Sequence, residues 1–429
     1  MFGFANFLLL ALFAAAVFDL IFALARGGGL RGALHGLWNT PHLLFGQQLA
    51  EWRLQLGRIL FAAGLAAYEI SVVFCNSMAR QNWAWVQGVM SPVLEWLAFL
   101  CFGAKILFGT HYTWRELLAG GALYFIARWV YFNSQNIWWI GIVVAVLAAK
   151  DVPLRRPLQV YFASGCAAMA VVLALHFAGI VAPDLTSERM GALRGTYGYG
   201  HPNTFGGLVF GLVLAYALLR AQKVRWVDCL LVFAVGVFLL VGPASRSAAL
   251  CTLALAVGLV FCRLRAGHSV PRWWPGTCVG MVGLTAAVSY LLPLLVIKVG
   301  PWNNDIGPAW LAKLDSLLTC RISLTWMAYR LLDVKIAGQV FNWPTVDNSF
   351  AFALFQFGPV VAALLGILFA AALLGHAKQG RRVEVCCLFA MLAYAYMEVQ
   401  PFHLTTNPTA LLLCGAVFVQ TSARWQKIE

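Results

Sequence analysis

The chain has 429 residues, of which 62% are hydrophobic and only 11% are charged. So few polar side chains cannot cover the surface of a water-soluble globule of this length. The formal net charge is +14, but the basic residues form short clusters between long apolar runs, which is typical of membrane-protein loops and not of a nucleic-acid-binding surface. We therefore expect residues 1–429 to form a single integral membrane domain with no nucleic-acid partner.

Apolar runs of about 20 residues recur along the chain, and each is long enough to cross the bilayer as a helix. The first, residues 4–25, has no basic segment before it, so it is predicted to be a retained span and not a cleaved signal peptide. Residues 26–58 are basic and rich in glycine and aromatic side chains, which predicts an interfacial stretch on the cytoplasmic side. The next spans are predicted at 59–79, 83–104, 117–133 and 136–149.

Basic clusters set the orientation of the rest, because cytoplasmic loops carry an excess of Lys and Arg. The clusters assigned to the cytoplasm are Lys150-Arg155-Arg156, Arg220-Lys223-Arg225, Arg263-Arg265-Arg272, Lys378-Arg381-Arg382 and Arg424-Lys427. The spans between them are predicted at 158–182, 203–220, 226–242, 247–262, 274–297, 347–375, 384–400 and 407–423. The fold class is therefore an all-α polytopic transmembrane bundle of about 12–13 spans.

Polar residues on the opposite side fall mainly in two loops, 183–202 and 298–346. The first is rich in glycine, and the following Pro202 and Asn203 suit the first turn and cap of a helix. A helix N-terminus favours anions, so a diphosphate is a reasonable guest. The alternative is a glycine-rich loop with an ordinary cap and a satisfied histidine at His201.

Arg246 stands in a very short turn on the non-cytoplasmic side, against the usual distribution of basic residues. Its long side chain either reaches lipid headgroups or coordinates a phosphate with its planar fork.

The 298–346 loop contains an amphipathic piece, Leu311 to Asp333, with apolar side chains at helical spacing. We expect it to lie along the outer interface, either as a plain surface helix or with Arg321 reaching a headgroup site. After it come Asp347 and Asn348 at the start of a span, and then Glu398 and His403.

Together these segments place arginines, carboxylates and two histidines on one membrane face, without a nucleotide-binding loop or a DXD metal motif. Arginines suit a diphosphate, whereas a carboxylate or histidine suits proton transfer with a sugar hydroxyl. The combination predicts transfer chemistry on a lipid-diphosphate substrate, with no cofactor and no bound metal.

In order along the chain, four motifs resemble those of the Wzy-type polysaccharide polymerases, and most closely the Gram-positive capsule and exopolysaccharide branch. They are Tyr199-Gly200-His201-Pro202-Asn203-Thr204-Phe205-Gly206, Ser245-Arg246-Ser247, Leu314-Asp315-Ser316-Leu317-Leu318-Thr319-Cys320-Arg321-Ile322-Ser323-Leu324, and Asp347-Asn348-Ser349-Phe350. The resemblance covers residues from about 190 to the end, including Glu398 and Asn407-Pro408, and the N-terminal half matches only in being hydrophobic.

This resemblance implies a metal-independent inverting glycosyltransferase with a GT-C-like membrane fold, related to the O-antigen ligases. The growing glycan on undecaprenyl diphosphate is the implied donor, and one lipid-linked repeat unit is the acceptor. The residues implied to neutralise the diphosphate are Arg194, Arg246 and Arg321. Those implied to activate the hydroxyl or orient the sugars are His201, Asp347, Glu398 and His403, with the base unassigned. Tyr199, Asn203 and Asn348 are expected beside the sugars or in the loops that hold them.

One departure is Cys320, where the resembling sequences more often carry a small, glycine-like residue, so the backbone near Arg321 is expected to differ. The expected location is the bacterial plasma membrane, with the site on the extracytoplasmic face among membrane lipids. Expected partners are a flippase and a chain-length regulator. Two alternatives stay open: a ligase that hands glycan to a lipid, wall polymer or protein, and a transporter or lipid flippase.

Overall fold

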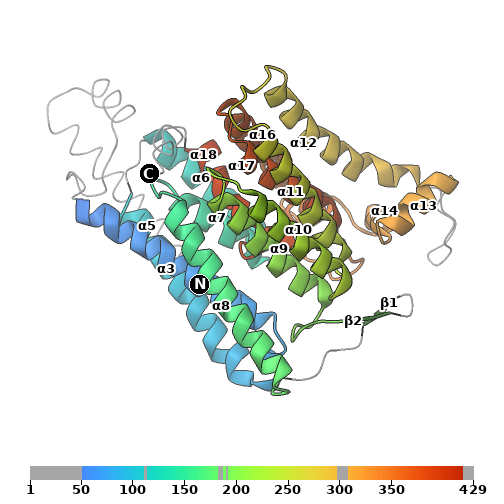
Figure 1. Cartoon of the computed structure of the whole chain (residues 1–429), viewed down its shortest axis with the longest axis horizontal. Helices are drawn as coiled ribbons and strands as arrows, with labels where there is room; N and C mark the ends of the chain where they lie inside the picture. The colour runs from blue at the N-terminus through green and yellow to red at the C-terminus, as the bar shows by residue number, and fades with distance from the viewer. Residues whose placement is uncertain (1–50, 111–113, 182–186, 190–191, 297–307, 419–429) are drawn as a thin grey trace. The chain divides into compact units, whose positions relative to one another are not determined.

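The computed structural model describes residues 51–110, 114–181, 187–189, 192–296 and 308–418. Within these residues the regular secondary structure is helical, apart from one antiparallel hairpin of β1 (Ser187–Arg189) with β2 (Ala192–Arg194) (Figure 1). The predicted all-α class is therefore confirmed. The predicted span 4–25 and residues 26–50 of the predicted interfacial stretch lie outside the described residues.

Seven helical segments among the described residues are long and apolar enough to cross a membrane. They are Trp52–Cys75 in α3 (Glu51–Cys75), Val86–Phe108 in η1 (Val86–Met90) and α5 (Ser91–Phe108), α8 (Arg155–Phe177), α9 (Pro202–Leu219), α11 (Arg246–Leu264), Trp274–Leu295 in α12 (Trp274–Leu291) and η2 (Leu292–Leu295), and α16 (Pro359–Lys378). Shorter apolar helices are α7 (Ile137–Ala148), α10 (Trp226–Val241) and Pro408–Val417 in η5 (Pro408–Leu413) and α18 (Cys414–Val417). The chain is a polytopic membrane protein.

The remaining helices are short, amphipathic or less apolar. They are α4 (Ala79–Asn82), α6 (Trp114–Ser134), α13 (Ala309–Leu317), α14 (Arg321–Leu331), α15 (Ser349–Phe352), η3 (Ala353–Phe357), α17 (Arg382–Met397) and η4 (Gln400–Phe402).

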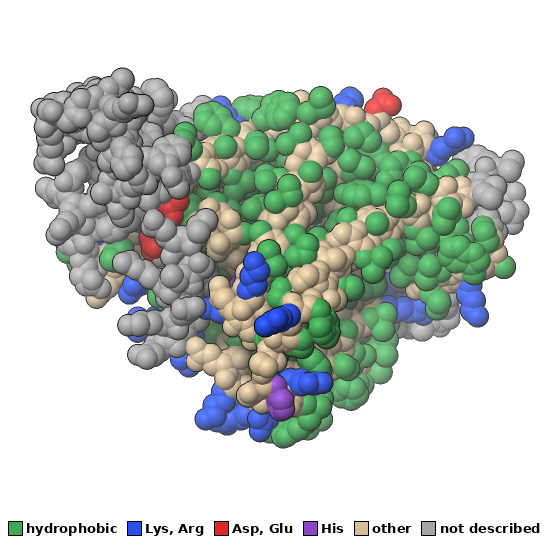
Figure 2. Space-filling model, turned by 90° about the horizontal axis from the view of Figure 1, so that it is seen from above, with side chains coloured by type: hydrophobic (Ala, Val, Ile, Leu, Met, Phe, Trp, Pro, Cys, Tyr) green, Lys and Arg blue, Asp and Glu red, His purple; other side chains and the backbone are tan. Residues whose placement is uncertain are grey.

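Large apolar side chains are exposed on the helices, among them Ile59, Leu230, Val257 and Ile367. Figure 2 shows that hydrophobic side chains cover most of the described part of one face, while Lys and Arg form small separate groups. Hydrocarbon is a suitable solvent for such a surface, and each helix satisfies its backbone hydrogen bonds internally.

The chain divides into two compact units. Unit 1 comprises residues 1–126, 141–182 and 417–429, and in it α3 packs against both α5 and α8 (Figure 1). Glycines allow α3 and α5 to approach closely, because a Cβ added to Gly109 would lie 2.8 Å from the Cα of Gly57.

Unit 2 comprises residues 127–140 and 183–416. In it α11 packs against α9, α10 and α17, and α12 packs against α16 and α17 (Figure 1). A Cβ added to Gly206 of α9 would lie 2.2 Å from the Ser245 Oγ, so a glycine is needed where α9 meets the turn before α11.

Several predicted helices end or break where the pattern of apolar residues gave no sign. The predicted amphipathic helix 311–333 is two helices, because Thr319 and Cys320 adopt φ of 60° and 63° between α13 and α14. The predicted span 347–375 is interrupted at Gly358, which takes φ of 87° where its backbone passes close to Ile336. Only α16, from Pro359, is long enough to span, whereas α15 and η3 before the break are short. These two predictions were wrong.

Two further boundaries also differ. Residues 51–58, predicted to be interfacial, form the first turns of α3. The predicted span 407–423 begins as the 3-10 helix η5, with Asn407 capping it through Ala410 N–H.

Candidate functional site

Glu398 is a buried carboxylate at the end of α17, with only 5% of its surface exposed. Its Oε1 accepts hydrogen bonds from Asn203 Nδ2 at 2.9 Å, from Ser247 Oγ at 2.8 Å and from Arg321 Nη2 at 3.0 Å. Its Oε2 makes no hydrogen bond with any residue that the structure describes. One oxygen of Glu398 is therefore held in place while the other stays available to a ligand.

Three helices begin at the residues that hold Glu398. Asn203 is the second residue of α9, Ser247 is the second residue of α11, and Arg321 is the first residue of α14. A helix N-terminus carries partial positive charge, so each of them favours an anion at this point. At α9 the start is set locally, since Pro202 occupies the first turn and the His201 Nδ1 accepts from Asn203 N–H at 3.1 Å.

Arg321 joins two carboxylates and is itself 8% exposed. Its Nη1 lies 3.0 Å from Asp347 Oδ2, its Nη2 lies 3.0 Å from Glu398 Oε1, and its Nε donates to the Met397 carbonyl at 2.9 Å. Nη1 also donates to the Thr319 carbonyl at 3.1 Å. All three guanidinium nitrogens are thus engaged, and the planar fork fixes where both carboxylates lie.

The start of α14 is built by Asp315, which is fully buried. Its Oδ1 accepts from Ile322 N–H at 2.8 Å and from Ser323 N–H at 3.1 Å. Cys320, just before Arg321, has φ of 63°, in the left-handed region that favours glycine. This backbone conformation favours glycine, and here Cys320 adopts it although it carries a side chain.

Arg194 is the last residue of β2 and is 6% exposed. Its Nη2 donates to Asn203 Oδ1 at 2.9 Å and to the Ala244 carbonyl at 3.2 Å. Because the Nδ2 of Asn203 donates to Glu398, this asparagine connects Arg194 with the carboxylate. The side chains of Arg194, Asn203, Arg321, Asp347 and Glu398 therefore form one hydrogen-bonded network, and each of them was predicted from sequence as a site residue.

The network affects the protonation of Glu398. Burial raises the pKa of Glu398 above its ordinary value, while the Arg321 guanidinium opposes that rise and the Asp347 carboxylate adds to it. The hydrogen bonds from Ser247 and Arg321 also favour the charged form. The net result is a raised pKa.

Other predicted residues lie next to members of this network along the chain. His201 and Arg246 are both exposed. His201 is the N-cap of α9, and Arg246 is the first residue of α11. Asn348 caps α15 through Phe350 N–H at 2.9 Å and donates to Ser289 Oγ at 3.1 Å. Tyr199 is buried with its ring centroid 5.6 Å from that of Phe205.

The His403 side chain packs against Trp138, with the two ring centroids 3.9 Å apart. Burial lowers the pKa of His403 to about 4. The side chain is therefore a neutral imidazole at pH 7, packed on an aromatic ring.

Two serines that contact Glu398 stand in the quoted motifs but were not predicted as site residues. Ser247 donates to Glu398 Oε1, and Ser349 Oγ donates to the Glu398 carbonyl. Each directly follows a predicted site residue, Arg246 or Asn348, and this adjacency is the signal that could have found them.

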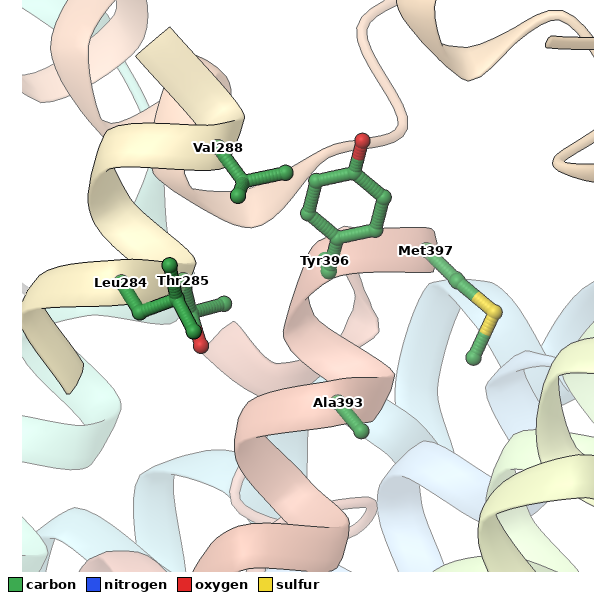
Figure 3. A pocket seen from close by; sticks show the side chains of 6 residues that line it. All are labelled: Leu284, Thr285, Val288, Ala393, Tyr396 and Met397. Carbon is green, nitrogen blue, oxygen red and sulfur yellow. The ribbon is translucent and has the colours of Figure 1, made fainter. Parts of the chain in front are cut away.

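An apolar groove of about 330 Å³ lies between α12 and α17. Figure 3 shows its lining, which consists of Leu284, Thr285, Val288, Ala393, Tyr396 and Met397. Met397 is the residue before Glu398 in the chain. Among the residues that the structure describes, there is no group of three or more His, Cys, Asp or Glu side chains placed to hold a metal ion.

No family model matches the sequence, and no curated protein or solved structure matches it. The likeness to Wzy-type polymerases is a resemblance of short motifs in order. The length and hydrophobicity of its helices show that the chain is a polytopic α-helical membrane protein.

Proposed function

We propose that the chain is a glycosyltransferase that joins undecaprenyl-diphosphate-linked repeat units into long polysaccharide at the outer leaflet of the bacterial plasma membrane. The observation that carries this proposal is the meeting of three helix N-termini and Arg321 at the buried carboxylate of Glu398. A site of this kind suits a reaction that takes a proton from a hydroxyl and releases an anion. The order of the polymerase-like motifs supports the same chemistry.

Glu398 is the proposed base. An acceptor sugar hydroxyl attacks the anomeric carbon of the donor, its proton passes to Glu398 Oε2, and the bond from that carbon to the diphosphate oxygen breaks. The lipid diphosphate leaves with the bonding electrons. The raised pKa of Glu398 suits this role, because a stronger base accepts the proton more readily near neutral pH.

The arginines have different proposed roles. Arg321 has every nitrogen engaged with this chain, so it positions Glu398 and Asp347 and does not bind the diphosphate directly. Arg246 is exposed at the first residue of α11, where a cation and a helix N-terminus together suit a phosphate. Arg194 supports the same region through Asn203.

The test uses purified protein in lipid nanodiscs with a verified lipid-linked repeat unit and no added metal or nucleotide. We expect a ladder of products from the wild-type chain and none from Glu398→Gln, which keeps the shape of the side chain and removes the base. Absence of a ladder from the wild-type chain would contradict the proposal. Transfer of glycan to a different acceptor would point to the ligase alternative.

Asp228→Asn is the matched control. Asp228 is also a buried carboxylate with an arginine partner, since Arg220 Nε lies 3.1 Å from its Oδ1. That pair lies at the opposite end of α9, whose 18 residues span about 27 Å. We expect Asp228→Asn to keep the ladder, so that loss in Glu398→Gln reports on the site and not on removal of a buried charge in general.

A further inference from the structure

Glu69 is an acidic residue in the membrane-spanning part of α3, and only 2% of its surface is exposed. In unit 1, α3 packs against both α5 and α8 (Figure 1). The side chain of Glu69 makes no hydrogen bond or ion pair with any residue that the structure describes. The charged form of a carboxyl group without a partner is costly in a protein interior within the membrane.

The other buried carboxylates among the described residues are all compensated. Each of them lies beside a cation or accepts backbone hydrogen bonds at the start of a helix. They are Glu116 beside Lys150 at 3.3 Å, Asp228 beside Arg220 at 3.1 Å, Glu398 beside Arg321 at 3.0 Å, and Asp315 at the start of α14. Glu69 is the exception in this set. A charge on Glu69 would stay uncompensated, whereas a bound proton removes the charge at the carboxyl group itself.

Among the described residues, the helices that pack against α3 bring no cation to Glu69. On α8, Tyr161 and Cys166 interact with it electrostatically, and the ordinary form of both side chains at pH 7 is neutral. The short helix η1 has no titratable side chain. Arg80 of α4 is exposed and donates to the Cys75 carbonyl at 3.3 Å.

The remaining neighbours of Glu69 lie on α3 and α5. The Tyr68 phenol interacts electrostatically with both Glu69 and Glu95. Glu95 is partly exposed, whereas Lys105, the cation of α5, donates to Thr110 Oγ1 at 2.6 Å. The groups around Glu69 are therefore two phenols, a thiol and a second acid. Such groups exchange protons but do not neutralise a carboxylate.

We propose that Glu69 is a proton-binding site inside the membrane, where its carboxyl group takes up and releases a proton. Glu69 lies six residues before the end of α3 at Cys75, which is about 9 Å along the helix axis, so the path to this end is short. A metal cation would need several oxygen ligands, and the described part of the chain has no group of three or more His, Cys, Asp or Glu side chains placed to hold one. Because Glu69 belongs to unit 1 and Glu398 to unit 2, the inference does not rest on the proposed function.

The first test detects the bound proton with dicyclohexylcarbodiimide, an apolar reagent that reacts with protonated carboxyl groups. The acid proton moves to one nitrogen of the reagent, the carboxyl oxygen bonds to its central carbon, and the acyl group then migrates to nitrogen without a leaving group. Wild-type protein in nanodiscs is treated at pH 6 to 10, and modified residues are identified by mass spectrometry. We expect Glu69 to be modified at pH 7, and its modification to fall about tenfold per pH unit once the carboxyl group titrates.

Glu116 is the matched control within the same protein, because it is also buried in unit 1 but lies beside Lys150. It should stay unmodified. Glu51 is the only other acidic residue of α3, so a modified α3 peptide is readily assigned. The inference would be overturned by an unmodified Glu69, by equal modification of Glu116, or by modification of Glu69 that is constant up to pH 10. Protection of Glu69 by sodium chloride but not by choline chloride at constant pH would overturn the proton as the ligand and indicate a metal cation.

The second test compares Glu69→Gln with the wild type by thermal unfolding in nanodiscs. Glutamine resembles the protonated carboxyl group, so the two proteins should unfold at the same temperature at pH 6. As the pH rises, the wild type should become the less stable of the two, because its folded form binds a proton that the unfolded chain has released. If Glu69→Gln is the less stable protein over the whole range, the charged carboxylate has a partner and the inference is wrong.

Glu116→Gln is the control for this second test. It leaves Lys150 buried without the Glu116 carboxylate, so it should unfold at a lower temperature than the wild type at pH 6. A fall of the same size in Glu69→Gln would count against the proton-binding site. The comparison thus separates a carboxyl group that binds a proton from one that balances a buried cation.

Discussion

Arg321 and Glu398 are 77 positions apart in the chain, and Arg321 Nη2 lies 3.0 Å from Glu398 Oε1. The same guanidinium holds Asp347 through Nη1, also at 3.0 Å. One buried cation thus places two carboxylates, so its loss affects both the stability and the chemistry of the site.

Arg321→Ala should destabilise the protein by about 3 kcal/mol, because two carboxylates lose the charge that offsets their burial. Thermal unfolding in nanodiscs measures the effect. Arg330→Ala is the control, since Arg330 lies on the same helix and is exposed over the Trp326 ring. Adding Glu398→Gln to Arg321→Ala should recover part of the loss. Equal unfolding temperatures for wild type and Arg321→Ala would show that the pair is not needed.

The rate of polymerisation should fall as the pH drops through the pKa of Glu398, because a base must be deprotonated to accept a proton. Burial raises this pKa, so the midpoint of the acid limb should lie above 4.5. Asp347→Asn removes a carboxylate that contributes to the rise, and the midpoint should move to lower pH. Rates measured from pH 4 to 8 test both statements. A midpoint that stays in place in Asp347→Asn would argue against Glu398 as the titrating group.

His403 should make the stability of the folded protein depend on pH below 6.5. Its pKa is lowered from 6.5 to about 4 in the folded protein, so the unfolded chain binds more protons between these values. Stability from this group is present above pH 6.5 and is lost as the pH falls towards 4, by at most about 3 kcal/mol. His403→Gln should lose less stability than the wild type over this range in denaturant titrations. Parallel losses in the two proteins would contradict this expectation.

Gly206→Ala should disturb the site through Ser245. The added Cβ would lie 2.2 Å from Ser245 Oγ, so the turn before α11 must shift and carry Ser247 away from Glu398. We expect a loss of about 1–3 kcal/mol in stability and a fall in activity. Gly366→Ala is the control, because nothing lies within 4 Å of its added Cβ. Ser245→Gly should rescue Gly206→Ala, and failure to do so would place the clash elsewhere.

Helices were predicted best where an apolar run is bounded by polar residues at both ends. The predicted spans 203–220 and 226–242 match α9 (Pro202–Leu219) and α10 (Trp226–Val241) to within one residue. Such runs satisfy their own backbone groups in lipid, so the local sequence suffices to place them. The break between α13 and α14 depends instead on positive φ at Thr319 and Cys320. Thr and Cys rarely adopt positive φ, so the sequence does not predict a turn there.

The composition by itself determined that this chain is a membrane protein. The positions of its arginines and carboxylates between the apolar runs determined which residues were predicted to form a site. Only the tertiary structure decided that Glu398 accepts hydrogen bonds from Ser247, 151 positions away, and from Asn203, 195 positions away. It also decided that Arg321 is occupied by this chain's own carboxylates. The physical reason is that hydrophobicity acts on each segment separately, whereas hydrogen bonds and ion pairs act at about 3 Å and depend on how distant segments pack.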